Sequence, residues 1–75
     1  MAETAQKEMI SVIVNGEARA IPGGSSLAAM LQAIGLDPRK VAVEHNLEVV
    51  PRSTFEDVEV REGDKFEIVH FVGGG

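Results

Sequence analysis

The sequence contains no cysteine, no tryptophan and no tyrosine, and its longest apolar runs are only a few residues. Without cysteine the chain can form no disulfide and can offer no thiolate to a metal, which fits a reducing cytoplasmic setting. The apolar runs fall far below the roughly 20 residues that a membrane-spanning helix needs. We therefore expect a cytoplasmic protein without a membrane partner.

Positive charge is also scarce. Seven lysines and arginines stand against twelve acidic residues, and the net charge is -5. A nucleic-acid binder needs a basic surface that neutralises phosphates, so the composition argues against such a partner. An acidic surface suits a partner protein with a basic docking face, although it also simply favours solubility.

The length of 75 residues allows one small domain, and 44% hydrophobic with 25% charged residues is typical of a globular protein. Residues 1–8 are polar and lack the apolar stretch of a secretory signal, so they are interpreted as a flexible leader. The domain is expected over residues 9–72, followed by a flexible glycine tail at 73–75.

The first predicted element is a hairpin. Residues 9–14 alternate in polarity as a strand does, and residues 17–21 return as a second strand. Between them stands Asn15-Gly16, a dipeptide that favours the two-residue turn in which both positions need a positive φ.

The second predicted element is a helix. Its apolar stripe has helical spacing and consists of Leu27, Met30, Leu31 and Ile34. Ser25 or Ser26 can cap its start, and Gly35 can end it in a left-handed conformation. Glycines and serines before a helix also resemble a phosphate cradle. The lysine and spacing of a phosphate-binding loop are missing, so capping is favoured.

The remaining chain predicts short extended segments with one helical turn at 53–56. The extended segments are residues 41–43, 48–50, 58–61 and 66–72. This order indicates an α+β domain in which a small mixed sheet packs on one main helix, with parallel strands before and after the helix. That architecture is the β-grasp, or ubiquitin-like, fold.

Side chains that could catalyse a reaction are not grouped in the sequence. His45 and His70 stand alone, without metal-ligand spacing, and are interpreted as structural or surface residues. Glu62 and Asp64 flank Gly63, where a turn explains them. We expect no enzyme activity, no metal site and no bound cofactor.

The glycines at 73–75 directly follow an apolar strand. Glycine adopts any backbone conformation and leaves the carbonyl open, so the α-carboxylate of Gly75 could enter a narrow site. ATP could activate it as an acyl-adenylate, and a sulfur nucleophile could then displace AMP. A frayed end or a cloned linker explains the same residues, and composition alone leaves these interpretations open.

Two stretches resemble a known family. VAVEHNLEVVPRS at 41–53 and REGDKFEIVHFVGGG at 61–75 are similar to the ThiS family, the bacterial sulfur carriers of thiamine biosynthesis. The Val-Pro-Arg segment ending at Arg52, the Gly63-Asp64 pair and the Gly-Gly end follow the family's order and spacing, and the resemblance runs from about residue 10 to residue 75.

The resemblance implies a β-grasp fold and a chemistry at the C-terminus. It implies that Gly75 is adenylated by a ThiF-like, E1-like enzyme that uses ATP, and is then converted to a thiocarboxylate. Sulfur would come from a donor such as a cysteine desulfurase and pass to a ThiG-like thiazole synthase. Gly73 and Gly74 would thread into the partner. Family members begin near the first strand, so the leader is a departure.

A docking surface is expected beside the tail. The last strand is apolar on both sides, and Val69 and Phe71 share the side that need not face the helix. A central strand that is covered on both faces is the alternative. Arg52 could pair with an acid on a partner, although a plain surface arginine is the alternative here too.

Two rival functions remain at this point. The chain could be another ubiquitin-like sulfur carrier, such as the small subunit of molybdopterin synthase or a carrier for cysteine or methionine synthesis. It could also be a non-covalent ubiquitin-like binding module, for which the tail would be irrelevant.

Overall fold

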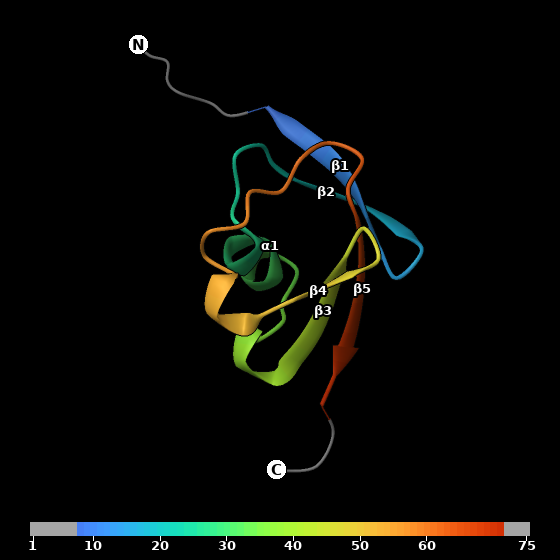
Figure 1. The fold of residues 1–75 in the computed structure, drawn as a ribbon. Helices are drawn as coiled ribbons and strands as arrows, with labels where there is room; N and C mark the ends of the chain where they lie inside the picture. The colour runs from blue at the N-terminus through green and yellow to red at the C-terminus, as the bar shows by residue number, and fades with distance from the viewer. Residues whose placement is uncertain (1–7, 72–75) are drawn as a thin grey trace.

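One sheet of five strands and one α-helix make up the part of the chain that the computed structural model describes, residues 8–71 (Figure 1). The elements are β1 (Met9–Val14), β2 (Glu17–Pro22), α1 (Leu27–Ala33), η1 (Pro38–Lys40), β3 (Val41–His45), β4 (Glu48–Val50), η2 (Arg52–Thr54) and β5 (Lys65–His70). Except for Glu8, the predicted leader and the glycine tail lie outside the described residues.

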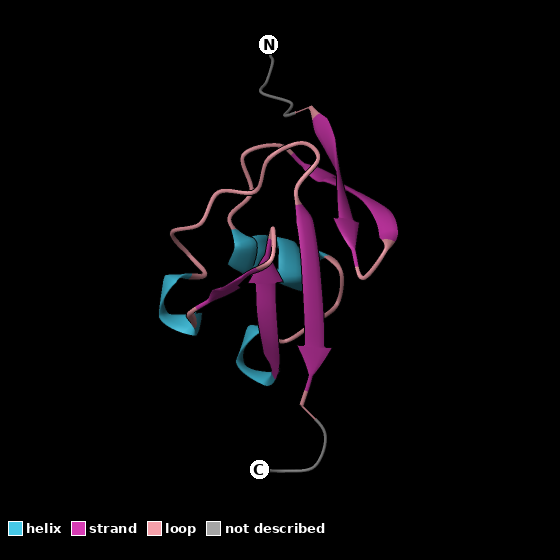
Figure 2. Cartoon of the chain, turned by 45° about the vertical axis from the view of Figure 1, so that its right-hand side comes forward, coloured by secondary structure: helices cyan, strands magenta, loops and turns pink. Residues whose placement is uncertain are grey.

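The strand order in the sheet is β2-β1-β5-β3-β4. Strands β1 and β5 are parallel, and the other neighbours are antiparallel. It follows that β2 and β3, on either side of α1 in the sequence, run in the same direction with β1 and β5 between them. Helix α1 lies on one face of the sheet (Figure 2). The predicted β-grasp architecture is confirmed.

The predicted hairpin is confirmed at its turn. Asn15 has φ +51° and Gly16 has φ +83°, so both central residues adopt the left-handed conformation that this turn requires. The turn sets a register in which Ile10 faces Ile21 and Val14 faces Glu17.

Both ends of α1 are closed as the sequence predicts. The Ser26 hydroxyl accepts a hydrogen bond from the Ala29 amide at 3.0 Å, so the capping interpretation is confirmed. At the other end, Gly35 has φ +88°. The amides of Gly35 and Leu36 donate to the carbonyls of Gln32 and Leu31 at 3.0 and 2.8 Å, which is the Schellman arrangement.

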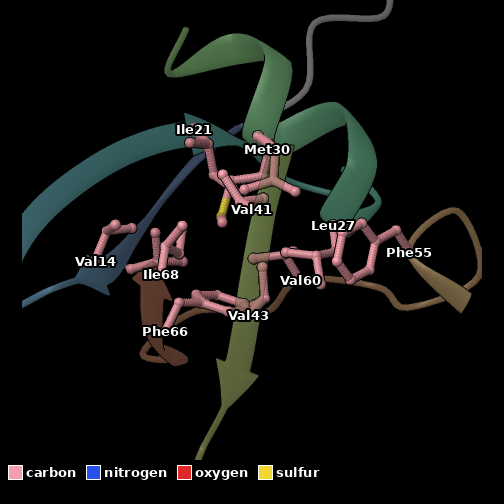
Figure 3. Close-up of a cluster of buried hydrophobic side chains, with 12 residues drawn as sticks. Val14, Ile21, Leu27, Met30, Val41, Val43, Phe55, Val60, Phe66 and Ile68 are labelled. Carbon is pink, nitrogen blue, oxygen red and sulfur yellow. The ribbon is translucent and has the colours of Figure 1, made fainter. Parts of the chain in front are cut away.

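The core lies between α1 and the inner face of the sheet (Figure 3). Leu27, Met30 and Leu31 are fully buried, whereas Ile34, the fourth member of the predicted stripe, is only partly buried. The other buried side chains are Val12, Val14, Ile21, Val41, Val43, Phe55, Val60, Phe66 and Ile68. Phe55 and Val60 come from the irregular segment between β4 and β5, which therefore forms part of the core.

Two short segments differ from the sequence prediction. The helical turn predicted at 53–56 is the 3-10 helix η2, over Arg52–Thr54. The extended piece predicted at 58–61 makes only an isolated bridge between Ser26 and Glu59. It is held at the start of α1, where the Leu27 amide donates to Val58 and the Val60 amide to Ser25.

The last strand ends at His70 rather than Val72. His70 is opposite Val41, the first residue of β3, so the neighbouring strand offers no partner beyond it. Val72 lies outside the described residues. Strand β3 in turn extends past the predicted residue 43 to His45. No helix within residues 8–71 has the length and hydrophobicity to cross a membrane.

Candidate functional site

The predicted reactive end, Gly73, Gly74 and Gly75, lies outside the described residues, so the site is defined by the residues that precede it. The chain leaves the sheet at Phe71, directly after β5. The Phe71 amide donates a hydrogen bond of 2.8 Å to the carbonyl of Lys40, the last residue of η1. This bond continues the pairing of β5 by one residue beyond the β3–β5 register.

Arg52 lies at the same place. Its Nε donates to the Pro38 carbonyl at 3.3 Å, and one terminal nitrogen donates to the Val41 carbonyl at 3.2 Å. Its guanidinium carbon lies 5.7 Å from the centre of the Phe71 ring, within the range of a cation–π contact. Arg52 therefore joins η1, the start of β3 and the exit of β5. Its predicted pairing with an acid on a partner stays a prediction.

The two faces of β5 differ completely in exposure. Phe66 and Ile68 are buried against the helix side, whereas Val69 and Phe71 are 63% and 52% exposed. Of the two alternatives for this strand, coverage on both faces is wrong and exposure of Val69 and Phe71 is right. Their role in docking stays a prediction.

Other residues extend this apolar area. Val69 is opposite Ala42 on β3, and Val49 on β4 is 74% exposed. Leu47, in the turn between β3 and β4, is 85% exposed. We call Ala42, Leu47, Val49, Val69 and Phe71 the outer-sheet patch. No local pattern in the sequence assigns Leu47 and Val49 to a surface, because the face of a three-residue strand and of its turn is fixed only by the register.

Two carboxylates interrupt the outer-sheet patch. Glu44 on β3 and Glu67 on β5 are directly opposite in the register, and both are exposed. Within residues 8–71 neither carboxylate lies within ion-pair distance of a cation. Like charges that face each other across strands destabilise a sheet slightly. The patch is thus apolar with an acidic centre.

His45 has a structural environment. Its Nε2 lies 3.0 Å from Oδ2 of Asp64, and its ring stacks on Phe66 with centroids 4.8 Å apart. Burial raises the pKa of the Asp64 carboxyl, but the hydrogen bonds from the Arg61 amide and from His45 outweigh it and hold this pKa below the ordinary value of 3.8. The pair fixes the turn before β5. His70 is exposed at the end of β5.

An open hollow of about 610 Å³ lies between α1, η1 and η2, and Arg52 forms part of its wall. The other lining residues are Ala28, Gln32, Leu36, Asp37, Pro38, Arg39, Ser53, Phe55 and Glu56. Within residues 8–71, no three histidine, aspartate or glutamate side chains lie close enough together to bind a metal ion.

Comparison with known proteins identifies relatives along almost the whole chain. Residues 12–75 match the model of the ThiS family. The sulfur carrier protein ThiS of Bacillus subtilis is 41% identical over 46 residues, which cover 61% of this chain and 70% of that protein. The crystal structure of the thiamine biosynthesis protein ThiS from Geobacter metallireducens superposes with a TM-score of 0.74 at 30% identity, covering 88% of this chain and all of that one.

A second group of relatives is much longer. A thiazole synthase of Paramagnetospirillum magneticum is 48% identical over 66 residues, which are 88% of this chain but 20% of that protein. A thiazole synthase of Magnetococcus marinus is 42% identical with the same coverage. The chain therefore spans about a fifth of the length of these curated relatives.

Proposed function

Because the chain belongs to the ThiS family, we propose that it is a sulfur carrier for thiazole formation in thiamine biosynthesis. The carrier group is a thiocarboxylate that replaces the α-carboxylate of Gly75. The observation that carries this proposal is the family match, which includes the three glycines at 73–75 as well as the folded domain. The absence of cysteine leaves the chain no thiol of its own that could carry the sulfur.

The proposed chemistry has two steps. A carboxylate oxygen of Gly75 attacks the α-phosphorus of ATP, pyrophosphate leaves, and an acyl-adenylate forms. A sulfur nucleophile then attacks the carbonyl carbon, so that a C–S bond forms and the C–O bond to AMP breaks. When the nucleophile is a persulfide, the resulting acyl disulfide is cleaved by a second thiol, which leaves the thiocarboxylate on Gly75.

The chain itself catalyses neither step under this proposal. A ThiF-like, E1-like adenylating enzyme binds and uses the ATP, a cysteine desulfurase supplies the sulfur, and a ThiG-like thiazole synthase accepts it. The glycines at 73 and 74 suit passage into these enzymes because they lack a Cβ. We place the reaction in the cytoplasm, where ATP is available to the adenylating enzyme.

Docking is assigned to the outer-sheet patch, which includes Val69 and Phe71, and to Arg52 beside Phe71. Exposed apolar side chains beside a reactive tail are what a transient interface requires. The Glu44–Glu67 pair adds negative charge to this surface. A partner that presents basic side chains around an apolar surface would therefore be complementary to it.

Deletion of Gly74 and Gly75 tests the proposal. The shortened chain should still fold and still bind the adenylating enzyme, but it should support no ATP–pyrophosphate exchange. A chain that kept its full biological function without these residues would instead be a non-covalent binding module.

The rival sulfur pathways are separated by the acceptor. The thiocarboxylated chain should transfer sulfur to a thiazole synthase and not to the large subunit of molybdopterin synthase. Two thiazole synthases contain a segment, about a fifth of their length, that is similar to this chain. This similarity favours a thiazole synthase as the acceptor.

A further inference from the structure

Phe71 is held in place by few interactions. It lies beyond the last residue of β5 that has a partner on β3, and its side chain is 52% exposed, so it is held less firmly than the buried residues of β5. Its amide makes one hydrogen bond, to Lys40. Its ring also contacts the guanidinium of Arg52, whose central carbon lies 5.7 Å from the ring centre.

Arg52 is itself fixed by the backbone that it contacts. Its Nε and a terminal nitrogen reach two different carbonyls, those of Pro38 and Val41, on either side of the junction between η1 and β3. Those two hydrogen bonds hold the guanidinium in place, and its central carbon lies over the Phe71 ring, 5.7 Å from the ring centre. A lysine has one charged atom and no planar face, so it cannot make all three contacts at once.

The geometry points to Arg52 as a positioning residue for the reaction at the tail. By holding Phe71 it fixes the last described residue before the segment that carries the proposed reaction. This inference rests on the proposed sulfur-carrier function. Four residues span at most about 14 Å, so a displaced starting point changes what the terminal carboxylate can reach. A longer flexible segment also lowers the effective concentration of the carboxylate at the partner's nucleotide.

This role differs from docking through an ion pair with a partner. An arginine that docked by charge would act on the affinity for the partner, and a lysine would largely replace it. An arginine that positions the tail acts after docking. Its loss lowers the rate of adenylation within the complex more than it lowers the affinity, and lysine restores little of that rate.

The kinetic test compares Arg52→Ala and Arg52→Lys with the wild-type chain. Arg39→Ala is the matched control, because Arg39 is a neighbouring exposed arginine whose side chain, within residues 8–71, pairs with Asp37. With a ThiF-type enzyme and ATP, both Arg52 variants should lower kcat for adenylation by about three- to tenfold, the range of one or two lost polar contacts. The KM for the chain should change by a smaller factor than kcat, and Arg39→Ala should match the wild type.

Three kinetic results would overturn the assignment: a wild-type kcat in Arg52→Ala, a loss confined to KM, or full recovery in Arg52→Lys. The double variant Arg52→Ala with Phe71→Leu adds a further check. If Arg52 acts through Phe71, the double variant should be no slower than the slower single variant. If the kcat losses of the two single variants add up in the double variant, Arg52 does not act through Phe71.

Amide hydrogen exchange provides a readout that does not depend on activity. Arg52→Ala should speed exchange of the Phe71 amide by about three- to tenfold, because the contact that holds its ring is gone, while the Val43 amide in the middle of the sheet stays unchanged. Unchanged exchange at Phe71 would refute the positioning role. If the wild-type chain is never adenylated, the sulfur-carrier proposal fails, and the exchange result still decides whether Arg52 holds Phe71.

Discussion

Two asparagines show how much a single residue does in this domain. Asn15 and Asn46 both adopt positive φ, at +51° and +50°. The side-chain amide of Asn15 donates to the Ile68 carbonyl at 3.1 Å and accepts from the Ile68 amide at 2.7 Å, as a neighbouring strand would. Asn46 accepts from the Lys65 amide at 3.0 Å. Both turns are thereby attached to β5.

Replacement of each asparagine by glycine measures the contribution of its side-chain hydrogen bonds to stability apart from that of the turn conformation. Glycine keeps the positive φ, so only the side-chain hydrogen bonds are lost. Asn15→Gly should lower the free energy of unfolding by about 1–3 kcal/mol, because it leaves two partly buried backbone groups of Ile68 without partners. Asn46→Gly should cost less, since its bonds are exposed. Urea unfolding measures both, and equal losses would contradict this account.

Asp64 predicts a dependence of stability on pH. Its pKa in the folded chain lies below the ordinary value of 3.8. The carboxylate therefore stabilises the fold fully above that value, and the contribution is lost as the pH falls below 3.8 through the lowered pKa.

Urea unfolding at a series of pH values tests this dependence. Asp64→Asn should reduce the slope of unfolding free energy against pH in this acid range. Part of the slope should remain, because Asp37 also has a lowered pKa, of about 2, beside Arg39. A slope identical to that of the wild type would rule out a contribution from Asp64.

At the scale of elements, β5 connects the core to the outer surface. Phe66 and Ile68 complete the core, while Val69 and Phe71 belong to the outer-sheet patch. The strand is central in the sheet, between β1 and β3, so both its position and its end are fixed by neighbours. Phe71, the last described residue, therefore belongs to the patch that is proposed to dock.

Substitution of Val69 tests the patch. Val69→Ser should weaken binding to the adenylating enzyme by about tenfold, as expected for an apolar side chain in the core of an interface. It should change the free energy of unfolding by about 1 kcal/mol or less, because Val69 is 63% exposed.

Met9 supplies the control for this substitution. It is 59% exposed and lies in β1, toward the opposite end of the molecule from the exit of β5 (Figure 1). Met9→Ser should leave binding unchanged. An equal loss in the two variants would show that the patch is not the docking surface.

The turn, the ends of the helix and the core faces could be predicted, because each is specified by residues that lie close together in the sequence. Asn15-Gly16 fixes a turn, Ser26 and Gly35 fix the ends of a helix, and period-2 or helical spacing assigns the core faces. The isolated bridge at Glu59 and the end of β5 at His70 could not be predicted, because both depend on which distant backbone group remains as a partner.

The site could be predicted only in part for the same reason. The exposure of Val69 and Phe71 follows from alternation along one strand. The contacts of Arg52 with Pro38, Val41 and Phe71 join residues that are 11 to 19 positions apart, and no local pattern signals them. The side-chain hydrogen bonds of Asn15 reach Ile68, 53 positions away, and the Asn-Gly turn pattern gives no indication of them.

At the scale of the whole molecule, the five-stranded sheet and helix α1 enclose a single core within residues 8–71. The end of the domain at which β5 leaves the sheet holds Phe71 and the rest of the outer-sheet patch. The glycines at 73–75 follow shortly after Phe71 in the sequence. The proposed sulfur chemistry is assigned to Gly75, and the described part of the fold ends shortly before it, at Phe71.

The central claim is that Gly75 carries sulfur, and intact mass spectrometry tests it directly. The full chain is incubated with a ThiF-type adenylating enzyme, ATP, and a cysteine desulfurase with cysteine and a reducing thiol. The account predicts a mass increase equal to the exchange of one oxygen for sulfur, located at the C-terminal residue by fragmentation. A chain whose mass stays unchanged while a known ThiS carrier is converted in the same mixture would contradict it.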